Sequence, residues 1–224
     1  MNKIRYCNVV SGNTINKFLQ NLKVYQKTPE LVELRADTIK KLTLSNLYQI
    51  KNELKKPAIF TLRNKAEGGC CNYSEKKRVS LISQADKIRF EYIDIELSTS
   101  HQVINSLKTK TIISYHNFKK TPSYSQLTKV INQAKNFSPY AIKITTYVNN
   151  TDDIHTLINI MNYQPIIVKK IVIGMGKIGQ ITRILSPTYP PHIAYTYQGS
   201  VSQAPGQIEI SEMKNTYSKY GIIY

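Results

Sequence analysis

The chain has no tryptophan and only three cysteines among its 224 residues. The cysteines are Cys7, Cys70 and Cys71, and two of them are adjacent. Thiols of this number and spacing do not suit a disulfide framework or a tetrahedral zinc site. No apolar run approaches the roughly 18 residues that a membrane-spanning helix requires, and the start of the chain lacks the apolar segment of a signal peptide. The sequence therefore predicts a cytoplasmic protein with no membrane partner and no bound metal.

Acidic residues are also scarce, with 14 Asp and Glu against 31 Lys and Arg, which gives a formal net charge of +17. Nucleic-acid-binding proteins concentrate such an excess in one face, arm or block. Here the lysines occur in scattered pairs, and no basic block of five or more residues is present. We interpret the excess as a lysine-rich exterior that can also attract a small anion. No nucleic-acid partner is expected, although a basic nucleic-acid-binding protein stays as an alternative.

Short apolar runs alternate along the chain with longer amphipathic segments, and no Pro-, Gly- or Ser-rich linker divides it. The runs that predict strands are 4–10, 31–35, 58–63, 92–97, 111–116, 140–145, 170–175 and 192–197. The segments that predict helices are 15–25, 44–55, 75–90, 102–108, 124–136, 152–162, 179–185 and 207–218. This alternation predicts the α/β class. The length of the chain and its eight strand–helix units favour a (β/α)8 TIM barrel, a single domain spanning residues 1–224, over a doubly wound open sheet.

Charged side chains alternate with apolar ones inside five of the predicted strands. In the segment 31–35, for example, Glu33 and Arg35 lie on either side of Leu34. Successive side chains on a strand point to opposite faces, and the outer face of a barrel is apolar because helices cover it. We therefore expect the charged set to point inward, where unpaired ionisable groups are costly. The pattern favours an active site at the C-terminal mouth of a barrel.

Lys143 and His116 are the candidate reactive residues. A lysine confined beside Arg35, Arg63 and Arg183 is disfavoured as an ammonium ion by desolvation and by like charge. Both effects lower its pKa and favour the neutral amine, which is a nucleophile for a carbonyl carbon. His116 ends the preceding predicted strand, and an imidazole suits general acid–base catalysis near neutral pH.

Three other features admit more than one interpretation. Glu67, on a glycine-containing loop, could orient His116 and stabilise its charged form. Asp94 and Glu96 could form an acid–base pair, a metal site or the charge balance for nearby cations. The segment 174–179 matches G-x-G-x-x-G. It lacks the acidic residue about 20 positions on that a dinucleotide site needs, so a glycine-rich turn near an anion is the preferred interpretation.

Several short strings occur along nearly the whole chain in one characteristic order. They are 33–37 (ELRAD), 61–63 (TLR), 67–69 (EGG), 94–96 (DIE), 114–118 (SYHNF), 121–122 (TP), Lys143, 175–176 (MG), Arg183, 199–200 (GS) and 204–207 (APGQ). Each string is weak alone. Together they resemble the type I 3-dehydroquinate dehydratases.

The resemblance implies a (β/α)8 lyase that needs no cofactor. The implied reaction dehydrates the small anion 3-dehydroquinate to 3-dehydroshikimate in the shikimate pathway of aromatic amino-acid biosynthesis. Lys143 matches the lysine that forms a Schiff base with the substrate ketone, His116 the histidine that relays protons, and Glu67 the carboxylate partnered with that histidine. The matching substrate-binding residues are Glu33, Arg35 and Arg63 for the ring hydroxyls, with Arg183 and Gln207 for the carboxylate.

The last loop departs from the family pattern, because Gln203 stands where the family often has serine. We expect Gln203 or Ser202 to supply the contact of that serine. The resemblance also implies a homodimer and, as a fusion or pathway partner, shikimate dehydrogenase. A class I Schiff-base aldolase on the same barrel is the alternative enzyme.

Overall fold

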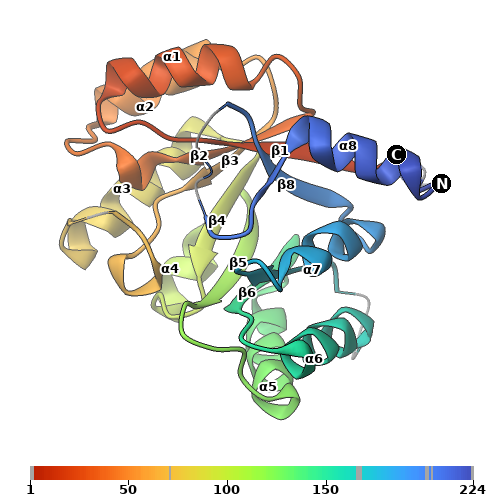
Figure 1. Ribbon diagram of the computed structural model, residues 1–224. Helices are drawn as coiled ribbons and strands as arrows, with labels where there is room; N and C mark the ends of the chain where they lie inside the picture. The colour runs from red at the N-terminus through yellow and green to blue at the C-terminus, as the bar shows by residue number, and fades with distance from the viewer. Residues whose placement is uncertain (1–2, 71, 165–167, 200–201, 203, 223–224) are drawn as a thin grey trace.

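The computed structural model describes residues 3–70, 72–164, 168–199, 202 and 204–222. In these ranges, nine parallel strands form one curled sheet in the order β7-β6-β5-β4-β3-β2-β1-β8-β9 (Figure 1). The strands are β1 (Arg5–Val10), β2 (Leu31–Arg35), β3 (Ala58–Thr61), β4 (Tyr92–Glu96), β5 (Lys110–Asn117), β6 (Ala141–Tyr147), β7 (Lys170–Met175), β8 (Ile193–Tyr197) and β9 (Ile208–Glu209).

Among the described residues, eight α-helices alternate with the strands and lie around the outside of the sheet (Figure 1). They are α1 (Ile15–Tyr25), α2 (Leu44–Glu53), α3 (Glu75–Ile88), α4 (His101–Ser106), α5 (Tyr124–Ala134), α6 (Thr151–Asn162), α7 (Gln180–Leu185) and α8 (Ile210–Lys219). Short 3-10 helices cover Ala36–Thr38, Lys65–Glu67, Lys135–Phe137 and Ser186–Thr188. The (β/α)8 prediction is confirmed. Within the described ranges, no helix is long and apolar enough to cross a bilayer.

The sheet has a seam between β7 and β8. In the described part of the chain, no strand pairing joins these two strands, whereas β8 pairs with β1 on its other side. Side chains close the seam instead, since Ile173 of β7 and Tyr195 of β8 belong to the same apolar cluster inside the barrel. A backbone hydrogen bond of 3.0 Å from Lys170 N to Pro190 O adds a contact beside it.

The two faces of each strand have different surroundings, as the alternation in the sequence predicts. Leu34 on β2 is fully buried in the main core between the sheet and the helices. Its neighbours Glu33 and Arg35 point the other way and line a pocket inside the barrel. Burying an aliphatic side chain of this size contributes roughly 1.5–3 kcal/mol, so the outward face stabilises the fold while the inward face is free to carry charge.

Local sequence signals fix several helix starts. Ser123 precedes α5, and its side chain accepts a hydrogen bond from the backbone N–H of Gln126, whose own side chain accepts from the Ser123 N–H. This reciprocal arrangement is a capping box, in which side chains satisfy N–H groups that have no partner in the helix. The last unit differs from the prediction: residues Ile208–Glu209 form the short strand β9 beside β8 before α8 begins.

Candidate active site

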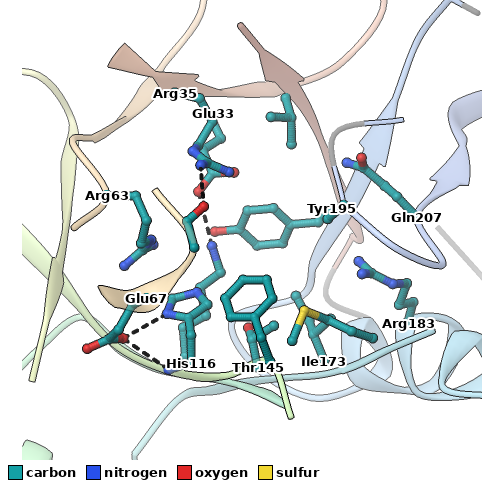
Figure 2. Close-up of a pocket in the computed structure, with 16 residues that line it drawn as sticks. Glu33, Arg35, Arg63, Glu67, His116, Thr145, Ile173, Arg183, Tyr195 and Gln207 are labelled. Carbon is teal, nitrogen blue, oxygen red and sulfur yellow. Dashed lines mark hydrogen bonds and ion pairs between the residues drawn. The ribbon is translucent and has the colours of Figure 1, made fainter. Parts of the chain in front are cut away.

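A pocket of about 550 Å³, open to solvent, lies inside the barrel near the C-terminal ends of the strands (Figure 2). Eight of the nine residues that the sequence predicts for the site line it. They are Glu33, Arg35, Arg63, Glu67, His116, Lys143, Arg183 and Gln207. The ninth, Gln203, lies outside the described residues, and Ser202 is exposed.

Lys143 is buried on β6, and its amine contacts acidic groups. Its Nζ lies 3.0 Å from Oε1 of Glu33 and 3.2 Å from Oδ2 of Asp94. It also lies 4.2 Å from the centre of the Tyr195 ring, a cation–π distance. The expectation of an amine crowded by guanidinium groups is therefore wrong about its contacts. The reason is that inward positions of β2 and β4 are acidic, and a buried ammonium ion requires such partners.

Asp94 and Glu96 neutralise the cations beneath the pocket. Arg63 donates to Asp94 at 2.7 Å and to Glu96 at 3.0 Å, and Arg78 pairs with the other Glu96 oxygen at 2.7 Å. Burial works to raise the pKa of Asp94, but the charges of Arg63 and Lys143 outweigh it and hold that pKa well below its usual range. Of the three interpretations of this carboxylate pair, the contacts support charge balance.

Arg35 is held at the pocket wall by a residue that sequence reasoning gave no role. Asp37 accepts two hydrogen bonds from the Arg35 guanidinium, both of 2.8 Å, and a third of 3.0 Å from the backbone N–H of Cys70. Burial would lower the pKa of Arg35, but Asp37 raises it above its ordinary value. The bidentate geometry fixes the plane of the guanidinium. Cys70 itself is an exposed free thiol, and Cys71 lies outside the described residues.

The predicted contact between His116 and Glu67 is present (Figure 2). Nδ1 of the imidazole and the backbone N–H of His116 both lie 3.1 Å from Oε2 of Glu67, while Ser98 donates to Oε1 at 2.8 Å. Because a carboxylate accepts at Nδ1, the neutral ring carries its proton there and leaves the Nε2 lone pair available as a base.

Burial sets the protonation of this pair. Desolvation, helped by the positive charges of Arg63 and Lys143, lowers the pKa of His116 well below 6.5. Desolvation also raises the pKa of Glu67, although the hydrogen bond from Ser98 works against that change. The imidazole is therefore neutral at neutral pH and ready to accept a proton.

Arg183 and Gln207 lie on the side of the pocket opposite Glu67 and His116 (Figure 2). Arg183 donates from Nη2 to the carbonyl of Pro205 at 3.1 Å, but its buried Nε has no hydrogen-bond partner in the part of the chain described here. Desolvation lowers the pKa of Arg183 to about 10, so it stays charged at neutral pH. No carboxylate among the described residues contacts this buried guanidinium, so it is suited to bind an anion.

The glycines of segment 174–179 build a compact turn between β7 and α7. A Cβ on Gly179 would lie 2.6 Å from the carbonyl oxygen of Gly174, and Gly176 has a φ of +85° that favours glycine. Thr182 accepts from the Gly174 N–H at 2.7 Å. The predicted strand-to-helix turn is confirmed, and it holds Arg183 of α7 against the pocket.

Other residues that line the pocket had no role in the sequence interpretation. They include Phe118, Thr145 and Tyr195. Phe118 lies nearly parallel to the His116 ring, with 6.3 Å between centres, and packs so closely on Gly68 that a Cβ there would lie 2.2 Å from its Cζ. Strand alternation could have identified Thr145, because it lies two positions after Lys143 on the same strand face.

Comparison with known proteins identifies the family. The family model for type I 3-dehydroquinase matches residues 6–224. The chain belongs to this family. It is 31% identical to a 3-dehydroquinate dehydratase from Coxiella burnetii (strain CbuK_Q154) over 221 residues, which are 98% of this chain and 95% of that protein.

Solved structures of this dehydratase have the same fold as the chain. The 3-dehydroquinate dehydratase from Geobacillus kaustophilus HTA426 superposes with a TM-score of 0.89 at 23% identity. The match covers 98% of this chain and 91% of the Geobacillus chain. A dehydroquinate dehydratase and shikimate dehydrogenase protein from S. pombe matches with a TM-score of 0.85 at 23% identity. All of this chain, but only 46% of that longer protein, takes part in the match. As a type I 3-dehydroquinase, the chain is an enzyme, which argues against the nucleic-acid-binding alternative.

Proposed function

We propose that the chain is one catalytic barrel that dehydrates 3-dehydroquinate to 3-dehydroshikimate through a Schiff base on Lys143. The observation that carries the proposal is the shared pocket of a buried lysine amine, a histidine with a carboxylate on its Nδ1, and a buried guanidinium without a carboxylate in contact among the described residues. Family membership favours dehydration over cleavage by an aldolase.

The two sides of the pocket suit different parts of the substrate. Arg183 and Gln207 would hold the substrate carboxylate, because Arg183 is charged and its Nε lacks a partner among the described residues. The ring hydroxyls would face the charged side chains that line the rest of the pocket, Glu33, Arg35 and Arg63. A substrate held at both ends would present its ketone to the Lys143 amine between them.

In the first half of the reaction, the Lys143 nitrogen bonds to the ketone carbon. The amine reacts in its neutral form, after the ammonium ion has given up a proton. That proton and a second one pass in turn from the nitrogen to the ketone oxygen with His116 as the relay, and the oxygen leaves as water, which gives a protonated imine. The resting ammonium ion and the iminium both carry their positive charge on the Lys143 nitrogen, close to Glu33 and Asp94. The carboxylates that pair with the resting amine therefore also stabilise the iminium.

The iminium makes the adjacent C–H acidic, because the electrons of that C–H bond can move toward the positively charged nitrogen when the proton leaves. Neutral His116 removes that proton and then donates it to the departing hydroxyl, so the C–O bond breaks and a C=C bond forms. Addition of water to the imine carbon finally releases the product and restores the amine. The lowered pKa of His116 supports its role as a neutral base.

Borohydride reduction of the enzyme during turnover, followed by peptide mass mapping, tests the proposal. We expect one substrate-derived adduct, on Lys143, and its loss together with turnover in Lys143→Ala. Lys170→Met is the matched control, because Lys170 is equally buried on a barrel strand but lies outside the pocket. An adduct on another lysine, or turnover without any adduct, would refute the mechanism.

We also propose a cytoplasmic homodimer that functions with shikimate dehydrogenase. The exposed apolar side chains of Ile178 and Ile181 beside and on α7 support self-association, since a second copy could cover them. The S. pombe protein that contains both enzymes supports shikimate dehydrogenase as the partner.

Light scattering should give twice the chain mass of 25.7 kDa, and a monomer would refute the dimer. Cell fractionation and co-purification of the dehydrogenase test the location and the partner.

A further inference from the structure

Thr145 is a neighbour of both reactive residues of the pocket, Lys143 along β6 and His116 across to β5. It follows Lys143 by two positions on β6, so both side chains leave the same strand face. In the parallel register of β5 and β6 it is opposite His116. It lines the pocket and is 7% exposed, and Figure 2 shows it beside His116 at the base of the pocket. The Thr145 hydroxyl therefore lies in the same part of the pocket as the reactive side chains.

The Thr145 hydroxyl has no partner in the part of the fold that is described. Its Oγ1 is buried, and no described residue forms a hydrogen bond with it. The inward hydroxyls of Thr61 and Ser114 are paired, with Glu33 at 3.1 Å and Asp94 at 2.6 Å. The Tyr195 hydroxyl, like that of Thr145, has no partner among the described residues. A buried hydroxyl without a partner destabilises the fold relative to a valine of the same shape. The unsatisfied hydroxyl is thus better suited to a ligand than to the fold.

Water is the ligand that this position fits. The proposed reaction releases water when the imine forms and consumes water when the imine is hydrolysed, both at the carbon attached to Lys143. A water molecule there needs a base for one proton and a further polar partner to hold its lone pair toward the carbon. His116 can be the base, and a hydroxyl opposite His116 on the neighbouring strand can be the second partner.

We propose that Thr145 binds this hydrolytic water and orients it between His116 and the imine carbon, an inference that rests on the proposed function. His116 removes one proton as the water oxygen bonds to carbon, and the C=N electron pair moves to nitrogen. The other water hydrogen is donated to Thr145 Oγ1. The resulting carbinolamine then loses its O–H proton as the C–N bond breaks, and the Lys143 nitrogen takes up a proton. Thr145 bonds to no substrate atom in this step and is a positioning residue.

Thr145→Val and Thr145→Ser separate the hydroxyl from the shape of the side chain. In Thr145→Val we expect kcat for 3-dehydroquinate to fall by about 10- to 100-fold, the effect of misplacing one reactant, with KM changed less than threefold. Imine hydrolysis should slow selectively, so the fraction of Lys143 trapped by borohydride in the steady state should rise. Thr145→Ser keeps a hydroxyl and should retain kcat within about threefold. The thermal midpoint of the valine variant without substrate should equal or exceed that of the wild type.

Three results would overturn the proposal while the wild type is active. They are an unchanged kcat and trapped fraction in Thr145→Val, an equal loss in the serine and valine variants, or a midpoint several degrees lower in the valine variant. The last result would show that the hydroxyl has a structural partner. A wild type that forms no Lys143 adduct and releases no dehydrated product would refute the proposed function, and this inference with it.

Discussion

Replacing Asp94 by asparagine should destabilise the barrel strongly. Asp94 is fully buried and accepts from Arg63 at 2.7 Å, from Ser114 at 2.6 Å and from Lys143 at 3.2 Å. Asparagine keeps the shape and one acceptor oxygen, but it leaves two buried cations with one less negative charge. Removing one partner of a buried ion pair typically costs about 3–5 kcal/mol.

Urea unfolding at pH 7 should measure this loss as a lower free energy of unfolding, and a thermal melt gives a second measure. For a chain of this size, each kcal/mol lowers the thermal midpoint by roughly 2–4 °C, so the variant should melt roughly 6–20 °C lower. Glu91→Gln is the control, since the Glu91–Lys110 pair has a similar distance of 2.7 Å but both side chains are exposed. Exposed pairs contribute little to stability because water screens them, so the control should unfold at nearly the same urea concentration as the wild type.

The pH dependence gives a second, independent measurement. The pKa of Asp94 is lower in the folded chain than its ordinary value of 3.8. Its contribution to stability is therefore complete above pH 3.8 and is lost as the pH falls toward the folded pKa. The wild type should lose stability through this acid range more steeply than Asp94→Asn. A loss below about 1 kcal/mol at pH 7, or equal acid slopes in the two proteins, would refute the electrostatic account of the site.

Three further predictions concern the pocket. Because desolvation lowers the pKa of His116, kcat/KM should stay constant as the pH falls through 6.5 and should decline only at lower pH; a stopped-flow pH profile measures this. Gly68→Ala should cost about 1–2 kcal/mol through its φ of +78° and should lower kcat by displacing Phe118, as urea unfolding and initial rates will show. Arg183→Gln should raise KM roughly 10- to 100-fold, the value of a charge-assisted hydrogen bond, without lowering the thermal midpoint.

Each of these predictions has a contrary outcome. A decline in kcat/KM that is centred at or above pH 6.5 would contradict the effect of burial on His116. Wild-type stability in Gly68→Ala would show that the loop adjusts. Lys65→Ala, in the short helix that precedes Gly68, is the control for a general loop effect. An unchanged KM in Arg183→Gln would place the substrate carboxylate elsewhere.

Alternation along the strands was the part of the fold that could be predicted best. In β2, Leu34 had to face outward because helices cover the barrel, and this fixed the inward direction of Glu33 and Arg35. Element ends were less predictable, since they depend on single backbone angles. The helix expected over 75–90 ends at Ile88, because Arg89 adopts a left-handed φ of 59°.

The partners of the Lys143 amine could not be predicted from the sequence. Residue spacing indicated that Lys143 shares a confined space with arginines, but it did not indicate which group contacts its amine. The answer depends on distances across the barrel between strands that are far apart in the chain, as with Glu33 and Asp94. The contact of Arg78 with Glu96 depends on the same kind of long-range geometry, whereas Asp37 lies only two positions after the Arg35 that it holds.

The seam between β7 and β8 gives a bound anion a mechanical role. Arg183 belongs to α7, which follows β7, whereas Gln207 precedes β9, which pairs with β8. One carboxylate held by both residues would connect two flanks that lack a shared ladder within the described chain. Occupation of the pocket would thus complete the barrel wall non-covalently, and resistance to unfolding should increase most along that gap.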